Sequence, residues 1–383
     1  MKILHLITDH QVIERTLGIY EEVFPDCNEV LVFPINKKPF KHLKKYATCP
    51  KVDRNNLNEF VSSYDFSGIT YVIIHYLSFE KLDFIKYVPK NVHVCWEIYG
   101  YDLYDQFLKC YGYQLYYKVD TIKYRRFGII KKLFGTIINT LLILKGIKYR
   151  YKWQKRRQFN YICNRVDSLQ FCCGYDAKLV EEYAQRTIPS YEIFNYSLSE
   201  VLGELKDIPF FEGKDILIGN SASFSNNHYY TLEYLERIGI PERSTLIIPL
   251  AYGGIGKYPD DVERSFNQSF PGRVETYRAY MPLHEYNKTF LRLNAMILSH
   301  WRQESQGTAI MGFYLGIKVF MSSRNPLYQW FVDCGFTVFR IEDATKDDFS
   351  IPLDLKQKEK NRQIVIERYN EKVFIETLRS NIK

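Results

Sequence analysis

The stretch ILIGNSASFSNNH, residues 216–228, decides the fold class. It begins as a short apolar run and changes at Gly219 into small and polar residues that lead into a pattern with helical spacing. Four more apolar runs follow, and helical patterns lie between them. The runs predict strands at Asp215–Ile218, Leu246–Pro249, Val274–Tyr277, Ala295–Ser299 and Lys318–Ser322, and the patterns predict helices at Tyr229–Ile238, Asp260–Phe270, Leu283–Leu293 and Thr308–Leu315.

Strands that alternate with helices are typical of an α/β fold, in which a parallel sheet is covered by helices and ligands bind beyond the carboxyl ends of the strands. Polar and Gly-rich turns follow the predicted strands at this edge. Small residues and helix starts present backbone N–H groups to anions, although they also serve as ordinary turns and caps in any protein. Because several such turns converge, we expect a nucleotide-phosphate site formed by Gly219, Asn220, Ser221, Asn227, His228, Pro249, Tyr252, Gly253, Arg302, Gln303, Gly307, Thr308 and Asn325.

The first half of the chain repeats the strand pattern. It predicts strands at Lys2–Ile7, Glu29–Phe33, Tyr71–Ile74, Val92–Ile98, Ser168–Cys172 and Tyr191–Asn195, and a final strand at Thr337–Arg340. Carboxylates near the strand ends are candidates for the base that deprotonates an acceptor hydroxyl, namely Asp9, Glu97 and Asp102. His75, Trp96 and Tyr99 are candidates for acceptor contact, because aromatic faces pack against sugar C–H surfaces.

Structural roles remain open for the same residues. Asp9 could cap a helix that begins near Val12, and Asp102 could close a turn whose aromatic neighbours lie in the core. A single His after a strand, such as His75, is most often structural. The residue types alone do not decide between these interpretations.

The motifs ILIGNSASFSNNH, LIIPLAYGG, RQESQGT from Arg302, and RNPLYQW, together with WEIYGYDLY from Trp96 to Tyr104, resemble the bacterial TDP-Fuc4NAc transferase family, also described as 4-alpha-L-fucosyltransferases. The resemblance extends from the ILH opening to the Tyr328–Trp330 neighbourhood. It departs from the family over residues 118–158, which differ in length and charge, and at the aromatic positions beside His300.

The resemblance implies a GT-B glycosyltransferase, in which two doubly wound, Rossmann-like parallel-sheet domains face a cleft. We expect an acceptor-binding domain at 1–205, a nucleotide-sugar domain at 206–355, and a helix at 356–383 that packs across the domain boundary. The implied reaction transfers a deoxyamino sugar from a TDP-sugar to a polyprenyl-pyrophosphate-linked saccharide. The alternatives are a UDP-sugar transferase of capsule or O-antigen synthesis and a non-catalytic, membrane-associated scaffold that binds a nucleotide.

Residues 118–158 carry thirteen Lys and Arg against one acid, a net charge of +12, whereas the whole chain has +8 and the remainder therefore −4. Apolar residues recur within this segment at helical spacing. Its longest apolar stretch, 134–144, is about half of the ~20 residues needed to cross a bilayer, so we expect it to lie on an anionic membrane surface. We expect no nucleic-acid partner, because Ile and Leu are interleaved with the charges, although a helix pair with a solvated basic face is also consistent. The membrane-contacting candidates are Arg125, Arg126, Lys131, Lys132, Phe134, Arg156 and Arg157.

The remaining composition constrains location and cofactors. Eight scattered cysteines form no C-x-x-C pair, and the chain opens directly on a strand pattern with no signal peptide. We therefore expect a cytoplasmic protein bound peripherally to the inner face of the cytoplasmic membrane. Because no D-x-D motif occurs in a strand context, we expect neither a metal nor another cofactor.

Overall fold

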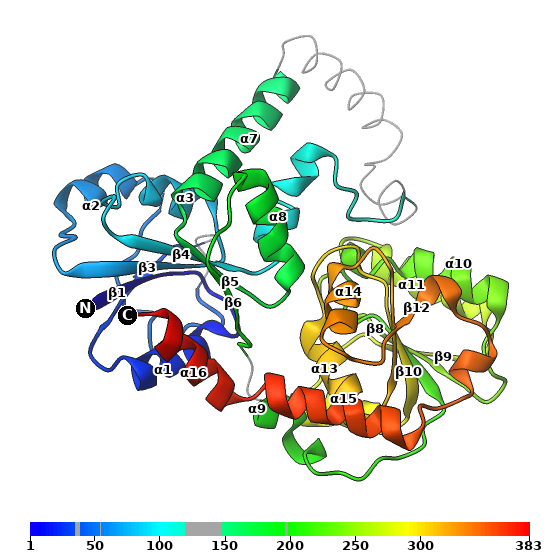
Figure 1. The fold of residues 1–383 in the computed structure, drawn as a ribbon. Coiled ribbons are helices and arrows are strands. Elements are labelled where there is room, and N and C mark those ends of the chain that lie inside the picture. Colours follow the sequence, from blue (N-terminus) through cyan, green and yellow to red (C-terminus); the bar gives the residue numbers. More distant parts are fainter. Residues whose placement is uncertain (35–38, 54, 119–146, 196–197) are drawn as a thin grey trace. The chain divides into compact units, whose positions relative to one another are not determined.

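The computed structural model describes residues 1–34, 39–53, 55–118, 147–195 and 198–383. The chain divides into two compact units (Figure 1). Unit 1 comprises residues 1–112, 151–197 and 369–383, and unit 2 comprises residues 113–150 and 198–368.

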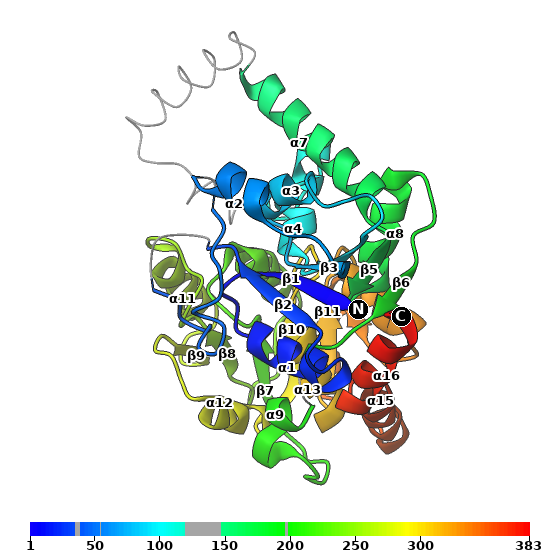
Figure 2. The same ribbon diagram turned by 90° about the vertical axis from the view of Figure 1, so that its left-hand side faces the viewer.

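Unit 1 contains a six-stranded parallel sheet with the order β2-β1-β3-β4-β5-β6. Its central strands are mostly buried and therefore read as nearly continuous apolar runs, whereas the edge strands β2 and β6 are partly exposed. Helices α1 and α16 lie on one face of this sheet, and α3 and α8 lie on the other (Figures 1 and 2). The strands are β1 (Lys2–Ile7), β2 (Asn28–Val32), β3 (Ile69–His75), β4 (His93–Ile98), β5 (Ser168–Phe171) and β6 (Ser190–Glu192); the helices are α1 (Ile13–Val23), α2 (Leu57–Ser63), α3 (Phe79–Ile85), α4 (Tyr101–Tyr104), α7 (Ile147–Arg165), α8 (Gly174–Ala184) and α16 (Glu371–Asn381).

Unit 2 contains a second six-stranded parallel sheet with the order β12-β11-β10-β7-β8-β9. Leu232 and Leu235 of α10 and Phe266 of α11 join the core on one face of it. On the other face α13 approaches closely at Gly312, where a Cβ atom would lie 2.6 Å from the Met296 side chain. The strands are β7 (Asp215–Ile218), β8 (Leu246–Pro249), β9 (Val274–Tyr277), β10 (Leu293–Leu298), β11 (Lys318–Met321) and β12 (Phe339–Arg340); the helices are α9 (Leu198–Leu202), α10 (His228–Ile238), α11 (Tyr258–Ser269), α12 (Leu283–Phe290), α13 (Gln306–Leu315), α14 (Pro326–Asp333) and α15 (Leu355–Arg368).

The carboxyl-terminal region differs from the single long helix that we expected. Two helices, α15 and α16, are separated at Tyr369 and Asn370. Asn370 caps α16, because its side chain accepts a hydrogen bond from the backbone N–H of Val373 at 3.0 Å. Helix α15 packs on α13 in unit 2, whereas α16 packs on α1 and β6 in unit 1, so the chain returns to unit 1 at its end.

Candidate functional site

Each sheet has a point where the chain changes direction across the strand order. In unit 2 the chain runs outward from β7 through β8 to β9, and then returns to β10 on the other side of β7 before it continues to β11 and β12. In unit 1 the corresponding point lies between β1 and β3. Ligands of open α/β sheets bind beyond the carboxyl ends of the strands at such a point. The two strand edges are therefore the first places to look for a site.

In unit 2 the turn after β7 is fixed by Asn226. Gly219 has φ +65°, and a Cβ atom there would lie 2.3 Å from Asn226 Oδ1. The same oxygen accepts from the Asn220 N–H at 2.8 Å, and Asn226 Nδ2 donates to Ser221 Oγ at 3.0 Å. The structure thus brings the expected residues Gly219, Asn220 and Ser221 into one rigid turn. Asn226 itself was not among the expected site residues.

The turn after β7 contacts the loop after β8. The Ala222 N–H donates to the Tyr252 carbonyl oxygen at 2.8 Å, and Gly253 has φ +79° beside Ser223. The Tyr252 side chain is exposed. Pro249, the last residue of β8, is paired with Tyr277 of β9. The loop therefore supports the turn through its backbone.

Asn227 joins the ends of β7 and β10. It has φ +50°, and its Nδ2 donates to the Ser299 carbonyl oxygen at 2.9 Å. Its Oδ1 accepts from the Tyr117 N–H at 2.8 Å. A second contact, from Thr231 Oγ1 to Ser299 Oγ at 2.7 Å, fixes the same junction. Asn227 is fully buried, so its role in this structure is to hold the two loops together.

Two buried histidines follow at this edge. His228 Nδ1 lies 3.0 Å from the Tyr258 hydroxyl, and His300 Nε2 lies 3.2 Å from Ser305 Oγ. Burial, followed by the nearby His300, lowers the pKa of His228 to about 3, and burial lowers the pKa of His300 to about 4. Both imidazoles are therefore neutral at pH 7. Neither ring therefore offers a positive charge to a phosphate.

Arg302 is ion-paired with Glu304. Its Nε and its terminal nitrogen donate to Glu304 Oε2 at 3.0 and 2.8 Å, and the residue is 9 % exposed. Although burial alone raises the pKa of Glu304, the Arg302 guanidinium lowers it below its ordinary value. Gln303 lies between the two partners and is half-buried. The expected cation is thus already neutralised by a carboxylate.

Helix α13 begins directly after this pair. Ser305 precedes the helix with φ +68° and makes no side-chain cap to it. The first backbone N–H groups of an α-helix, among them here those of Gly307 and Thr308, have no carbonyl partner within the helix. An added Cβ atom at Gly307 would meet nothing within 4 Å. Gly307 and Thr308 therefore present open backbone donors at the end of β10.

Several buried polar atoms at this edge have no hydrogen-bond partner in the part of the chain that the structure describes. Buried polar groups are almost always satisfied, so each exception calls for an explanation. A bound ligand would explain these atoms, because its oxygen and nitrogen atoms would complete their hydrogen bonds. The atoms are Asn220 Oδ1, His228 Nε2, His300 Nδ1, Trp301 Nε1 and Asn325 Nδ2, and they lie on the loops after β7, β10 and β11.

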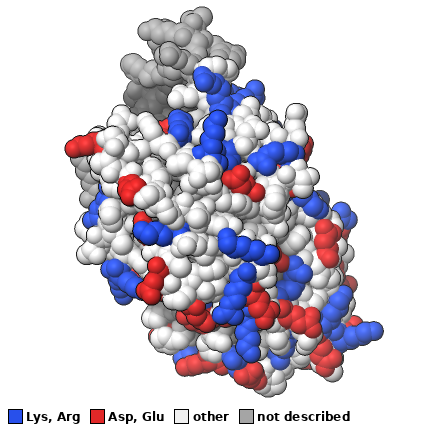
Figure 3. Space-filling model, turned by 60° about the vertical axis from the view of Figure 1, so that its left-hand side comes forward, with Lys and Arg blue, Asp and Glu red and all other residues white. Residues whose placement is uncertain are grey.

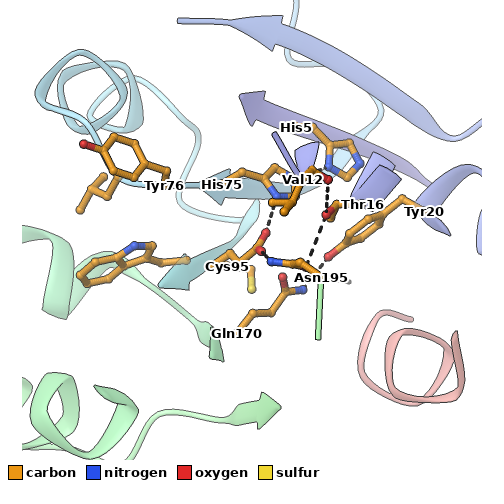
Figure 4. Close-up of polar contacts among 12 residues, drawn as sticks. His5, Val12, Thr16, Tyr20, His75, Tyr76, Cys95, Gln170 and Asn195 are labelled. Atoms are coloured by element: carbon orange, nitrogen blue, oxygen red, sulfur yellow. Dashed lines mark hydrogen bonds and ion pairs between the residues drawn. The ribbon is translucent and has the colours of Figure 1, made fainter. Parts of the chain in front are cut away.

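In unit 1 a buried chain of hydrogen bonds crosses the sheet (Figure 4). Asn28 Nδ2 donates to acceptors such as the Phe24 carbonyl oxygen, so Asn28 Oδ1 faces His5 Nε2 at 3.0 Å and requires an N–H there. Burial, followed by His75, lowers the pKa of His5 well below its ordinary value. Neutral His5 therefore accepts at Nδ1 from His75 Nε2, at 2.9 Å.

The other end of this chain holds Glu97. His75 Nδ1 and Glu97 Oε2 form a hydrogen bond at this end. Glu97 Oε1 accepts from Asn195 Nδ2, and both Glu97 and His75 are 1 % exposed. We expected Glu97 as a base and His75 as an acceptor contact. In this structure neither side chain reaches solvent, and their expected roles stay predictions.

The other two carboxylates are occupied by N–H donors. Asp9 accepts from the backbone N–H groups of Lys41, His42 and Leu43 at 2.7 to 3.0 Å. Burial alone raises the pKa of Asp9, but these three bonds lower it below its ordinary value. Asp9 thus anchors the loop at 41–43.

Asp102 closes the turn of the WEIYGYDLY motif. It is fully buried and accepts from Trp96 Nε1 at 2.9 Å and from the N–H groups of Leu77, Tyr99 and Leu103 at 2.9 to 3.0 Å. Burial raises its pKa to about 6. Trp96 is also fully buried, so in this structure Asp102 and Trp96 both hold the turn, and their expected roles as base and acceptor contact stay predictions.

His10 is a candidate that the sequence analysis missed. It follows β1, its ring lies edge-on to Tyr99 with centroids 5.2 Å apart, and its buried Nδ1 has no hydrogen-bond partner within the described ranges. Burial, followed by the charge of His42, lowers its pKa to about 4. The structure therefore brings a neutral imidazole together with the expected residue Tyr99. The feature of the sequence that could have identified His10 is its position shortly after a buried strand.

The basic segment is described in part. Arg125, Arg126, Lys131, Lys132 and Phe134 lie outside the described residues. Arg156 and Arg157 lie on α7 and are exposed, and Trp153 beside them is 57 % exposed. Figure 3 shows Lys and Arg side chains gathered at the top of the view, over α7. In the described part of the chain no helix is both long and apolar enough to cross a membrane.

The sequence matches the family described as 4-alpha-L-fucosyltransferase glycosyl transferase group 56 over residues 143–366, which is more than half of the chain. The chain belongs to this family. It is therefore a glycosyltransferase, and the match confirms the resemblance of its motifs. No curated protein is similar enough in sequence to count as a match.

Solved structures with the same fold are glycosyltransferases. HepE from Anabaena, in complex with UDP and glucose, has a TM-score of 0.60 at 11 % identity, over 100 % of this chain and 99 % of that chain. Sucrose-phosphate synthase from Thermosynechococcus elongatus has a TM-score of 0.60 at 10 % identity, over 99 % of this chain and 97 % of that chain. A glycosyltransferase from Rickettsia africae has a TM-score of 0.59 at 12 % identity, over 98 % of this chain and 96 % of that chain. These similarities, with the two doubly wound sheets, confirm the predicted GT-B fold class.

Proposed function

We propose that this glycosyltransferase moves a deoxyamino sugar from a TDP-sugar to a polyprenyl-pyrophosphate-linked saccharide. The observation that carries the proposal is the set of buried polar atoms at the switch point of unit 2 that have no partner among the described residues, because a polar ligand would complete their hydrogen bonds. Family membership supports sugar transfer, and the crystallised complex of HepE with UDP supports a nucleoside diphosphate as the ligand of such a fold.

In this proposal unit 2 binds the nucleotide sugar. The turn at Gly219–Ser221 and the open N–H groups at Gly307 and Thr308 face the carboxyl edge of the sheet, where the diphosphate would accept their hydrogen bonds. Neutral His228 and His300 would contribute hydrogen bonds without charge. The expected contact at Asn325 is retained, since its Nδ2 is unpaired among the described residues.

Unit 1 binds the acceptor, and we assign the base to His10. As the acceptor hydroxyl oxygen forms its bond to the anomeric carbon, the bond from that carbon to the diphosphate oxygen breaks. The nucleoside diphosphate leaves with the electron pair, and the hydroxyl proton passes to the imidazole. His10 suits this step because it is neutral at pH 7, whereas Asp9, Glu97 and Asp102 are each occupied by donors.

The direct test is a transfer assay with purified protein. TDP-Fuc4NAc and a polyprenyl-pyrophosphate-linked disaccharide are supplied in detergent, and the lipid product is identified by mass spectrometry. We expect turnover with the wild-type protein, a loss of about 10²- to 10⁴-fold in His10→Gln, and wild-type turnover in the exposed control His284→Gln. Turnover of His10→Gln at the wild-type rate would refute the assignment of the base.

The membrane part of the proposal rests on α7. Lys152, Trp153 and Arg157 are exposed on it, and basic residues near an anionic surface contribute about 1 kcal/mol each. Lys152→Glu with Arg157→Glu should release the protein from phosphatidylserine vesicles. The matched control reverses two exposed lysines of α15, Lys356 and Lys360. Equal sedimentation of both double variants with the vesicles would contradict membrane binding by α7.

A UDP-sugar donor is the second candidate, because HepE was crystallised with UDP and with UDP-glucose. UDP-sugars of capsule and O-antigen assembly are therefore assayed in parallel. Turnover with a UDP-sugar and none with TDP-sugars would keep the reaction class and replace the proposed donor.

A further inference from the structure

Arg324 holds an unusual position at the carboxyl edge of unit 2. It follows β11, and its guanidinium carbon lies 3.6 Å from the centroid of the Trp301 ring, which follows β10. Within the described residues it forms no salt bridge, and the hydrogen bond from its guanidinium to the Gln114 carbonyl oxygen is long at 3.4 Å. Stacking on an indole orients a guanidinium while it leaves the N–H groups free to donate.

The neighbours of Arg324 are also hydrogen-bond donors without acceptors. Trp301 is 3 % exposed and its indole Nε1 has no partner among the described residues. Asn325 is 1 % exposed, and its Oδ1 accepts from the Leu327 N–H at 3.0 Å as the cap of α14. Because this bond fixes the orientation of the amide, Asn325 Nδ2 is a donor, and it too is unpaired in the described part of the chain.

The carboxylate nearest to this cluster is already occupied. Glu342, whose charge acts on Arg324, accepts from the Tyr230 hydroxyl at 2.6 Å, from Ser322 Oγ at 2.8 Å and from the Ser323 N–H at 3.0 Å. Guanidinium and indole N–H groups cannot accept hydrogen bonds. Three donor groups, one of them cationic, therefore require a ligand that supplies oxygen acceptors with negative charge.

We propose that Arg324, Trp301 and Asn325 bind phosphate oxygens of the leaving nucleoside diphosphate, and that Arg302 braces the loop instead of binding the ligand. This inference rests on the proposed function. The negative charge on the leaving diphosphate grows as its bond to the sugar breaks, so a free cation is effective there. Arg302 cannot serve in the same way, because Glu304 neutralises it through two hydrogen bonds.

Calorimetric titration with thymidine, TMP and TDP tests this inference. We expect Arg324→Gln to weaken TDP binding by roughly 10- to 100-fold and thymidine binding not at all, since charge-assisted bonds are made only to phosphate. Arg324→Lys should recover part of the loss. Trp301→Phe keeps an aromatic face for stacking but removes the N–H together with the five-membered ring, so it should weaken TDP binding several-fold.

The matched control is Arg243→Gln, which removes an exposed arginine that precedes β8 at the opposite edge of the same sheet. It should bind TDP as the wild-type protein does. Wild-type TDP affinity in Arg324→Gln, or an equal loss in Arg243→Gln, would overturn the inference. Weakened binding of a prenyl diphosphate alone would assign the cluster to the acceptor and also overturn it. If the wild-type protein binds no nucleoside diphosphate, the proposed function fails as well.

Discussion

Substitution of Gly219 by Ala tests whether the turn after β7 is built as described. The left-handed conformation at φ +65° costs a non-glycine residue about 1–2 kcal/mol. In addition the new Cβ atom would lie 2.3 Å from Asn226 Oδ1. Asn226 must then move, and its bonds to the Asn220 N–H and to Ser221 Oγ are lost. At about 1 kcal/mol for each bond, the total loss is roughly 3–4 kcal/mol.

Gly256 supplies the matched control. It has φ +57°, and nothing lies within 4 Å of an added Cβ atom. Gly256→Ala should therefore cost only the conformational part, about 1–2 kcal/mol. The assay is urea unfolding of both variants together with calorimetric titration of TDP. We expect Gly219→Ala to lose about 2 kcal/mol more stability than the control and to bind TDP more weakly. Equal stability losses in both variants would refute the reasoning about Asn226.

Three further predictions concern buried or neutral groups. Burial raises the pKa of Asp176 to about 8, so the folded state keeps a proton that the unfolded state releases near pH 4. The free energy of unfolding therefore falls as the pH rises from about 4 to 8. In urea unfolding, Asp176→Asn should be more stable than the wild-type protein at pH 8 but not at pH 4. Equal gains at both pH values would contradict this. Asp102→Asn should lose about 2–4 kcal/mol of unfolding free energy, because four N–H groups donate to the Asp102 carboxylate. Unchanged stability would show that Asp102 does not hold the turn of the WEIYGYDLY motif. Because the pKa of His10 is about 4, kcat/KM should be flat from pH 6 to 8 and fall only near pH 4; a fall near pH 6.5 would argue against His10 as base.

The strands were predictable from sequence because buried parallel strands are short apolar runs between turn residues. All twelve predicted runs correspond to strands, and four of them, among them Asp215–Ile218 and Leu246–Pro249, have the predicted bounds. The order of the strands was not predicted, since it depends on pairing between distant segments. The switch points between β1 and β3 and between β7 and β10 became visible only in the structure.

The candidate site was also predictable from the sequence only in part. The turns of unit 2 were found because Gly, Ser and Asn mark a strand end by their local chemistry. The roles of Asp9 and Asp102 were not found, because they depend on N–H donors of other segments, such as Leu43 for Asp9 and Leu77 for Asp102. A carboxylate after a strand looks the same in sequence whether it faces a ligand or holds a loop.

A polar residue within an apolar run was a signal that could have been used. His5 interrupts β1, as His75 and Glu97 interrupt the ends of β3 and β4, and all three join one buried network. Buried polar groups need partners, so several interruptions in neighbouring strands indicate that they bond to one another. Without the strand order, however, the partners could not be identified.

The most direct test of the central claim is the melting temperature of the purified protein with TDP, UDP and GDP at matched concentrations. A ligand that binds only the folded state stabilises it by about 2.7 kcal/mol at 100 times its Kd. We predict a rise in the melting temperature that is largest with TDP and is strongly reduced in Gly219→Ala. A melting temperature that none of the three nucleotides changes would contradict the assignment of a nucleotide-sugar site to unit 2.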